Sequence, residues 1–225
     1  MEHYNIFATR LVPEMKGLWD GACWREVHSL AVNCFRPESS DHRPRTLCKL
    51  LYKESRIFGI FRVEDQFVRC LHTGFQSEVW KDSCVEMFMQ PKSGPEYFNF
   101  EFNCGGALLA SYVTDPTRQA GRLQKFMPLT PADNLQIIRY ASQPEAIDPE
   151  IVVPVVWFLE FSIPIPLLEK YTGPLGTIKG QTWRANFYKC GNETSHPHWA
   201  SWMPLPARNF HDPESFGQIE FCGER

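Results

Sequence analysis

The chain has 225 residues, of which 43% are hydrophobic, 22% are charged and 14% are aromatic, as is typical of a globular protein. Its formal net charge is −3 and its Lys and Arg residues form no basic block, which argues against nucleic acid as a partner, because phosphate backbones are bound through grouped cations. No apolar stretch approaches the ~20 residues that a membrane-spanning helix needs.

The first residues and the cysteines bear on the cellular compartment. Residues 1–11 lack the basic and apolar regions of a secretory signal. The sequence as it stands therefore predicts a cytoplasmic protein, or a secreted or periplasmic one if a signal has been removed. The eight cysteines are scattered without a CxxC pair, and several lie within apolar strand-like segments, which favours reduced and buried thiols.

Apolar and polar residues alternate with a period of two along much of the chain, which predicts strands. The predicted strands are 48–52 and 57–63, which form a hairpin, then 83–90, 97–103, 108–113, 135–140, 155–163, 183–188 and 218–222. Residues 166–171 are predicted as a short helix, and residues 114–131 as a turn followed by a long loop. Since the 18 prolines and 14 glycines lie mostly between these segments, we predict an all-β fold, an antiparallel β-sandwich of jelly-roll type with at most short helices, formed by residues 1–225 as one domain.

The segment 97–103 assigns its two faces most clearly. Three phenylalanines alternate in it with polar residues; they are Phe98, Phe100 and Phe102. Asn99 and Glu101 point to the opposite face. We expect the phenylalanines in the core, and the polar face in contact with water or with a ligand.

The tryptophans fall into two groups according to their surroundings. Trp157 and Trp183 lie in apolar strand faces, and we expect them in the core. Trp80, Trp199 and Trp202 lie in polar, loop-like segments. An accessible indole ring in such a place can stack on the apolar face of a sugar.

Polar side chains on the predicted strands could supply the hydrogen bonds that sugar hydroxyls require. The candidates are Glu86, Asn99, Glu101 and Arg184. Glu86 follows Trp80 at the entrance to a predicted strand. The other three are chosen because the strand periodicity places them on polar faces.

The order of the motifs resembles the family-nine carbohydrate-binding modules, and most closely their single-domain bacterial relatives. The similar segments are 50–65, Val-Trp-Lys-Asp-Ser-Cys-Val-Glu-Met-Phe-Met at 79–89, Tyr-Phe-Asn-Phe-Glu-Phe-Asn at 97–103, 183–188, 198–204 and 210–217. The likeness extends over about residues 24–221.

The resemblance implies a non-catalytic β-sandwich that grips the end of an oligo- or polysaccharide between two tryptophans. Trp80 and Glu86 match the family's tryptophan and acid ahead of the central strand. Trp202, or as the second choice Trp199, takes the place of the other tryptophan. The resemblance implies no required cofactor. A structural calcium ion, which the family often carries, is compatible with the sequence, although no dense Asp/Asn loop marks a site for it.

A glycan-active hydrolase is the first alternative. Glu86 and Glu101 lie on strands that could be neighbours, and a pair of carboxyl groups is the usual equipment for hydrolysing a glycosidic bond. A polar binding face would contain the same residues without catalysis.

A metal-binding or haem-binding sandwich domain is the second alternative. His196, His198 and His211 could together ligate zinc or iron, although Pro197 between the first two disfavours a strand and favours loop histidines. A haem group could be held by methionine and histidine, as in related sandwich domains. The residues concerned are Met87 or Met89 with His72.

Overall fold

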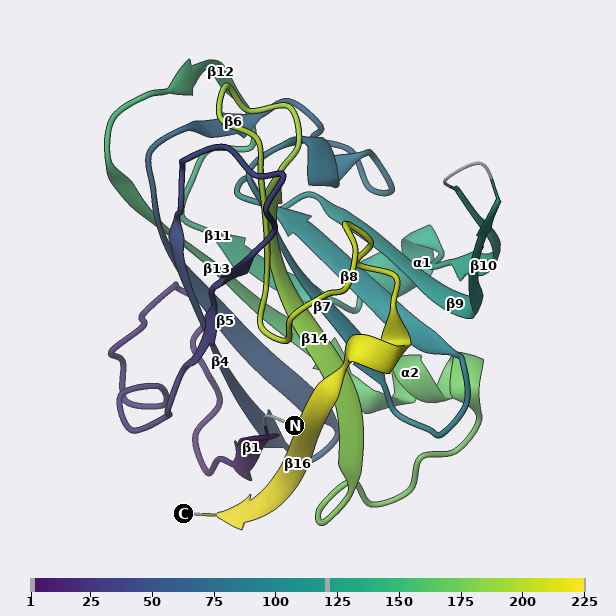
Figure 1. Cartoon of the computed structure of the whole chain (residues 1–225). Coiled ribbons are helices and arrows are strands. Elements are labelled where there is room, and N and C mark those ends of the chain that lie inside the picture. The colour runs from purple at the N-terminus through teal and green to yellow at the C-terminus, as the bar shows by residue number, and fades with distance from the viewer. Residues whose placement is uncertain (1–2, 120–121, 225) are drawn as a thin grey trace.

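The computed structural model describes residues 3–119 and 122–224, in which strands account for 49% of residues and helices for 8%. Figure 1 shows two layers of twisted strands packed face to face, with the helices at the margins. The prediction of a β-sandwich with only short helices is confirmed. None of the helices in the described residues has the length and apolar character that crossing a bilayer requires.

One large sheet curls over to form both layers, with the strand order β10-β9-β8-β7-β14-β16-β1-β4-β5-β13-β11. The strands of the first layer are β10 (Arg122–Pro128), β9 (Leu108–Gln119), β8 (Tyr97–Asn103), β7 (Cys84–Gln90), β14 (Thr182–Gly191) and β16 (Gly217–Glu224). The strands of the second layer are β1 (His3–Ala8), β4 (Arg45–Lys53), β5 (Arg56–Asp65), β13 (Val155–Pro164) and β11 (Ile138–Ala141). β1 runs parallel to both β16 and β4, so the sheet is mixed rather than purely antiparallel.

Shorter elements complete the fold at its ends. The short strands are β2 (Leu30–Val32), β3 (Cys34–Phe35), β6 (Val68–Cys70), β12 (Ile147–Ile151) and β15 (His198–Ser201). The helices are η1 (Val79–Lys81), α1 (Pro131–Asn134), α2 (Ile165–Thr172) and η2 (Pro213–Ser215). β15 pairs with β14 and with β3, so it extends one end of the first layer.

The main hydrophobic core lies between the layers and follows the predicted alternation. Phe98, Phe100 and Phe102 of β8 are all fully buried in it, as predicted. Phe102 stacks on Phe161 of β13 with ring centroids 5.2 Å apart, which joins the two layers directly. Trp157 and Trp183 are also core residues, as expected.

Two predictions for the region after residue 113 were wrong. The expected long loop at 114–131 is largely a hairpin, because β9 continues to Gln119 and β10 returns from Arg122. Beyond Val113 the strand β9 pairs only with β10, and β10 is exposed along most of its length, so neither shows the alternation that marks a half-buried strand. The strand predicted at 135–140 starts only at Ile138.

The residues before this late strand form the short helix α1. Its N-cap is a capping box, in which the Thr130 side chain accepts a hydrogen bond from the Asp133 backbone N–H and the Asp133 carboxylate accepts one from the Thr130 backbone N–H. Such a box favours a helical turn at this point over an extended strand.

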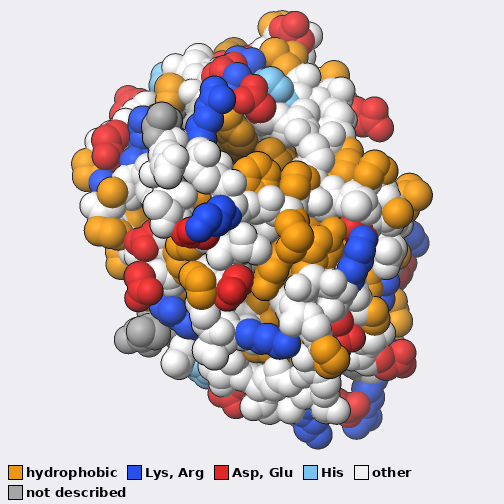
Figure 2. All heavy atoms as spheres, turned by 90° about the vertical axis from the view of Figure 1, so that its right-hand side faces the viewer, with side chains coloured by type: hydrophobic (Ala, Val, Ile, Leu, Met, Phe, Trp, Pro, Cys, Tyr) orange, Lys and Arg blue, Asp and Glu red, His pale blue; other side chains and the backbone are white. Residues whose placement is uncertain are grey.

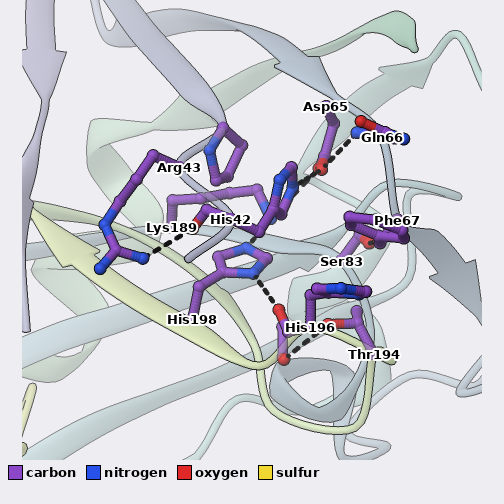
Figure 3. Close-up of polar contacts among 12 residues, drawn as sticks. His42, Arg43, Asp65, Gln66, Phe67, Ser83, Lys189, Thr194, His196 and His198 are labelled. Atoms are coloured by element: carbon purple, nitrogen blue, oxygen red, sulfur yellow. Dashed lines mark hydrogen bonds and ion pairs between the residues drawn. The ribbon is translucent and has the colours of Figure 1, made fainter. Parts of the chain in front are cut away.

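A buried ion pair connects the layers at one end of the sandwich (Figure 3). Lys189 of β14 points inward, and its Nζ lies 3.3 Å from the Asp65 carboxylate at the end of β5, with both side chains fully buried. Asp65 also receives hydrogen bonds from His42 at 2.7 Å and from the Trp157 indole at 3.2 Å. Burial alone would raise the pKa of Asp65, but Lys189 and His42 outweigh it and hold that pKa below its usual range.

Replacing a core phenylalanine tests the assignment of faces. We expect Phe100→Ala to lower the free energy of unfolding by about 3–5 kcal/mol, because burial is lost and a cavity remains. The matched control is Phe126→Ala on β10, since Phe126 is 44% exposed and should contribute little. Equal denaturation midpoints for Phe100→Ala and the parent would contradict the assignment.

Removing the buried cation tests the ion pair. We expect Lys189→Met to destabilise the fold by about 3–5 kcal/mol, because Asp65 is left as a buried charge without its main partner. Adding Asp65→Asn to this variant should restore part of the loss. Lys125→Met, which breaks the exposed pair between Lys125 and Asp115, should leave the denaturation curve nearly unchanged.

Candidate functional site

The outward face of β7, β8 and β14 carries the polar residues predicted from the alternation. Glu86 of β7 lies directly opposite Glu101 of β8, so the expectation that these two strands are neighbours is confirmed. Asn99 shares this face, and its Nδ2 donates a hydrogen bond to Glu101 Oε1 at 2.7 Å. The Asn99 Oδ1 atom is buried without a hydrogen-bond partner in the structure.

This polar face is covered by protein rather than open to water. Residues 203–216, here called the covering loop, cross in front of β7 and β8 between β15 and β16 (Figure 1). Phe210 of the loop stacks on Tyr188 with centroids 4.2 Å apart and accepts a hydrogen bond from the Tyr188 hydroxyl at its backbone oxygen. Asn99 and Glu101 are consequently only 3% and 4% exposed, although we expected them to face water or a ligand.

The two acids are therefore held in an unusual electrostatic setting. Burial raises the pKa of Glu86 well above its ordinary value, and the neighbouring Cys190 and Glu101 raise it further. Burial also raises the pKa of Glu101 to about 7, although the hydrogen bond from Asn99 and the charge of Arg118 oppose that rise. In the described part of the chain, neither carboxyl forms a salt bridge with a Lys or Arg side chain.

Trp80 and Trp199 lie together at the end of this face. Trp80 belongs to η1 and Trp199 to β15, and both half-buried rings pack against the same small cluster of Val79, Cys84 and Cys190. Asn192 connects them, because its backbone N–H donates to the Trp80 carbonyl and its Oδ1 accepts from the Trp199 indole N–H at 2.6 Å.

Each of these rings carries a cation. The Arg208 guanidinium of the covering loop lies 4.5 Å from the centroid of the Trp199 ring. The Lys81 ammonium lies 5.5 Å from the centroid of the Trp80 ring. Such contacts show that both rings present a face to polar groups at the surface.

Trp80 and Trp199 together form an edge of the molecule, here called the rim. The structure does not place Trp202 at the rim, contrary to the expectation that Trp202 stands beside Trp80. Trp202 is 5% exposed and belongs to the main core, where its ring centroid lies 5.7 Å from that of Phe187. Its ring also packs so closely on Gly217 that a Cβ there would lie 2.7 Å from Trp202 Cζ3. Trp199 is the tryptophan that shares a cluster with Trp80.

Arg184 lies away from the tryptophans. It is six residues before Cys190 on β14, a distance of about 20 Å along an extended strand. Its guanidinium donates to the backbone oxygens of Glu214 and Phe216 in the covering loop. Arg184 thus holds the loop rather than joining the Trp80 cluster.

The three histidines proposed as metal ligands do not converge. His198 is a buried residue of β15 rather than a loop residue, and its Nε2 lies 2.7 Å from Lys189 Nζ (Figure 3). The His196 ring stacks on Phe67, whereas His211 packs against Phe88 on the polar face. The two methionines considered for haem, Met87 and Met89, are buried in the main core.

The sequence-based reasoning missed several residues of this region. They are Cys84, Cys190, Asn192, Arg208 and Phe210. Cys84 and Glu86 are two residues apart on one strand, so the alternation already placed them on the same face. The position of Cys190 opposite Cys84 could not be predicted from alternation, because it depends on the register between β7 and β14.

Comparison with known proteins gives a consistent result. The family model described as "Carbohydrate-binding family 9" matches residues 23–221. A Bacteroides uniformis protein for which carbohydrate binding has been suggested is similar in structure, with 25% identity, a TM-score of 0.82, and coverage of 98% of this chain and 99% of that chain.

Two structures of a family-nine carbohydrate-binding module from Caldicellulosiruptor kristjanssonii share the fold. The complex with glucose has 12% identity, a TM-score of 0.62, and coverage of 98% of this chain and 97% of that chain. The complex with cellotriose has 11% identity, a TM-score of 0.64, and coverage of 100% and 95%. No curated protein matches this sequence.

The pH dependence of stability tests how firmly the covering loop is packed. Burial, aided by the charge of Arg118, lowers the pKa of His211 to about 3, and the Nδ1 atom of the ring lies within hydrogen-bond distance of the Tyr97 hydroxyl, at 2.7 Å. Below the unfolded value of about 6.5 the unfolded chain binds a proton that the folded chain does not. We therefore expect His211 to reduce stability as the pH falls from about 6.5 towards 3.

The contribution of His211 is measured as the difference between two variants. The free energy of unfolding between pH 6.5 and 4.5 should fall less steeply in His211→Gln than in the parent, by up to about 1.4 kcal/mol per pH unit. The exposed His28→Gln is the matched control and should keep the parent's slope. Parallel curves for His211→Gln and the parent would show that the ring is not held in its neutral form.

Proposed function

Because this chain belongs to carbohydrate-binding family 9, we propose that it binds the end of a saccharide between Trp80 and Trp199, without cleaving it. The observation that supports this proposal is the placement of the two half-buried indoles. They come from elements more than a hundred residues apart in sequence, yet they pack on one cluster and are bridged by Asn192. Trp80 and Trp199 differ in this respect from Trp157, Trp183 and Trp202, which are buried in the main core.

The surroundings of the two rings suit a sugar. Leu109 of β9 packs on the same cluster as the two rings, and Figure 2 shows the side of the molecule on which β9 and β10 lie, with hydrophobic side chains across its middle and charged side chains among them. Sugars present apolar C–H faces to flat rings and hydroxyl edges to polar groups. Arg208, Lys81 and Asn192 supply donors and an acceptor next to the rings.

A ligand at this rim requires little rearrangement. The Lys81 ammonium lies over the Trp80 ring, and the exposed Arg208 side chain places its guanidinium over the Trp199 ring. A pyranose can take the place of that guanidinium, which then becomes available to donate hydrogen bonds to the sugar hydroxyls. The relatives solved with glucose and with cellotriose make these two sugars the natural first ligands to test.

Glu86 is not assigned the contact with sugar hydroxyls that the sequence suggested for it. Glu86 is 2% exposed and lies beneath the tryptophan cluster rather than at its surface. It therefore does not meet the hydroxyls of a sugar that stacks on the rim. We assign contact with the ligand to Trp80, Trp199 and the polar groups beside them.

The adjacent carboxyls Glu86 and Glu101 favour a hydrolase as the alternative function. Both are almost completely buried, and a glycosidic bond would reach them only if the covering loop moved away. The proposal of binding without cleavage needs no such movement. Incubation with cellotriose followed by product analysis separates the two, because only a hydrolase releases shorter sugars.

Removing one ring tests the grip. We expect Trp80→Ala and Trp199→Ala each to cost about 2 kcal/mol or more of binding free energy, which corresponds to a dissociation constant about thirtyfold weaker. Calorimetric titration with glucose and cellotriose measures this change. Both variants should fold, because the two rings are half-buried at the surface.

Trp19→Ala provides the matched control. Trp19 is also half-buried and also carries a cation, with Lys49 Nζ 4.2 Å from the centroid of its ring, but it belongs to a cluster on the second layer. Its loss should leave sugar binding unchanged. If Trp80→Ala and Trp199→Ala bind as tightly as the parent while Trp19→Ala does too, the proposed rim is not the site.

A further inference from the structure

Three potential metal ligands meet beneath the tryptophan cluster. Cys84 and Glu86 project from the same face of β7, and Cys190 lies directly opposite Cys84 on β14. One ligand atom from each of the three side chains lies within 4.8 Å of the other two. In the described residues this is the one group of three or more His, Cys, Asp or Glu side chains that converges in this way.

The distances agree with the coordination sphere of a thiophilic metal. Glu86 Oε1 lies 3.2 Å from Cys190 Sγ and 3.9 Å from Cys84 Sγ. Tetrahedral zinc with bond lengths near 2.3 Å to sulfur and 2.1 Å to oxygen would place sulfur and oxygen about 3.6 Å apart and the two sulfurs about 3.8 Å apart. The two observed sulfur–oxygen distances are close to this value, and the two sulfurs lie within 4.8 Å of each other.

The surroundings also favour a cation at this place. Glu86 and Glu101 lie side by side, buried, and the described residues supply neither with a Lys or Arg partner within salt-bridge distance. A buried carboxylate charge is normally paired with a cation or bound to a metal, and a buried carboxyl without such a partner takes up a proton instead. The unpartnered Asn99 Oδ1 on the same face is a further buried acceptor without a donor.

The ligand types select the metal. Two thiols and one carboxyl suit Zn²⁺, whereas Ca²⁺ and Mg²⁺ take oxygen ligands alone. We propose that Cys84, Glu86 and Cys190 form a zinc-binding site. The Trp80 carbonyl, to which the Cys190 thiol donates at 3.5 Å, borders this site.

A site here would lie directly beneath the rim proposed for sugar. Val79, Cys84 and Cys190 form the cluster on which Trp80 and Trp199 rest, so a metal would stiffen the base of the tryptophan pair. Metal binding at this site does not depend on sugar binding, because the metal ligands are not the side chains proposed to contact the sugar.

Cobalt substitution tests the site. The protein is reduced, freed of metal with a chelator and titrated with Co²⁺ while the absorption spectrum is recorded. We expect an equimolar, saturable thiolate-to-cobalt charge-transfer band together with the visible bands of tetrahedral cobalt, and we expect Zn²⁺ to abolish both by displacement. A parent protein that shows no such band on titration overturns the proposal.

Variants of the ligands locate the metal. Cys84→Ser and Cys190→Ser should each lose the charge-transfer band, and Glu86→Gln should bind cobalt at least about tenfold more weakly, since even residues that only orient a ligand cost 10- to 100-fold. The matched controls are Cys70→Ser and Cys104→Ser, which alter another pair of adjacent buried thiols. A band that survives in both Cys84→Ser and Cys190→Ser, or disappears equally in the controls, contradicts the site.

Cysteine alkylation in the parent protein tests the site without any variant, so the test does not require that a variant folds. In the parent protein, Zn²⁺ should slow alkylation of Cys84 and Cys190 but leave alkylation of Cys70 and Cys104 unchanged, as read by peptide mass spectrometry. Equal rates with and without Zn²⁺ would overturn the proposal. Trp80→Ala and Trp199→Ala should keep the cobalt spectrum, so that loss of sugar binding and loss of metal binding are distinguished.

Discussion

The buried ion pair between Lys189 and Asp65 fixes how the two layers of this sandwich meet. Both side chains are removed from water, and Asp65 is held in addition by His42 and by the indole of Trp157. Apolar contacts tolerate sliding of one layer over another, but a buried charge that loses its partner is costly. The position of β14 over β5 is therefore defined by a small set of atoms.

The same ion pair determines what β14 presents on its outer side. Side chains alternate along a strand, so an inward Lys189 requires Tyr188 and Cys190 to point outward. Cys190 then lies opposite Cys84 and beneath the two tryptophans, and Tyr188 holds the covering loop through Phe210. The polar face, the rim and the thiol–carboxyl cluster all follow from the placement of this strand.

Period-two alternation explains how much could be predicted from the sequence. It located most of the long strands and the core phenylalanines correctly, because a half-buried strand displays its two environments in its residue pattern. The β9–β10 hairpin carries no such pattern, since its end is exposed on both faces. Alternation also says nothing about what covers a face, so the burial of Asn99 and Glu101 under the covering loop could not be foreseen.

Trp199 and Trp202 lie close together in the sequence but in different environments in the structure. Trp199 and Trp202 are three residues apart, and an odd separation in extended chain sends two side chains to opposite faces. β15 ends at Ser201, and the structure places Trp199 on its outer side and Trp202, just beyond the strand, in the core. Pro197 obscured that strand, whereas the structure shows β15 beginning immediately after it.

The burial of the polar face limits which ligands can reach each depth of the site. The covering loop is held by the stacking of Phe210 on Tyr188 and by the hydrogen bond between Tyr97 and His211, so exposing Glu101 to a sugar would break several aromatic and polar contacts at once. By contrast, Trp80 and Trp199 are half-buried, and the Lys81 and Arg208 side chains lie over their rings. The proposed metal ligands Cys84, Glu86 and Cys190 lie beneath these rings and are almost completely buried. The depth of each group thus separates the two tryptophans at the surface, which suit a sugar, from the two thiols and the carboxyl beneath them, which suit a cation.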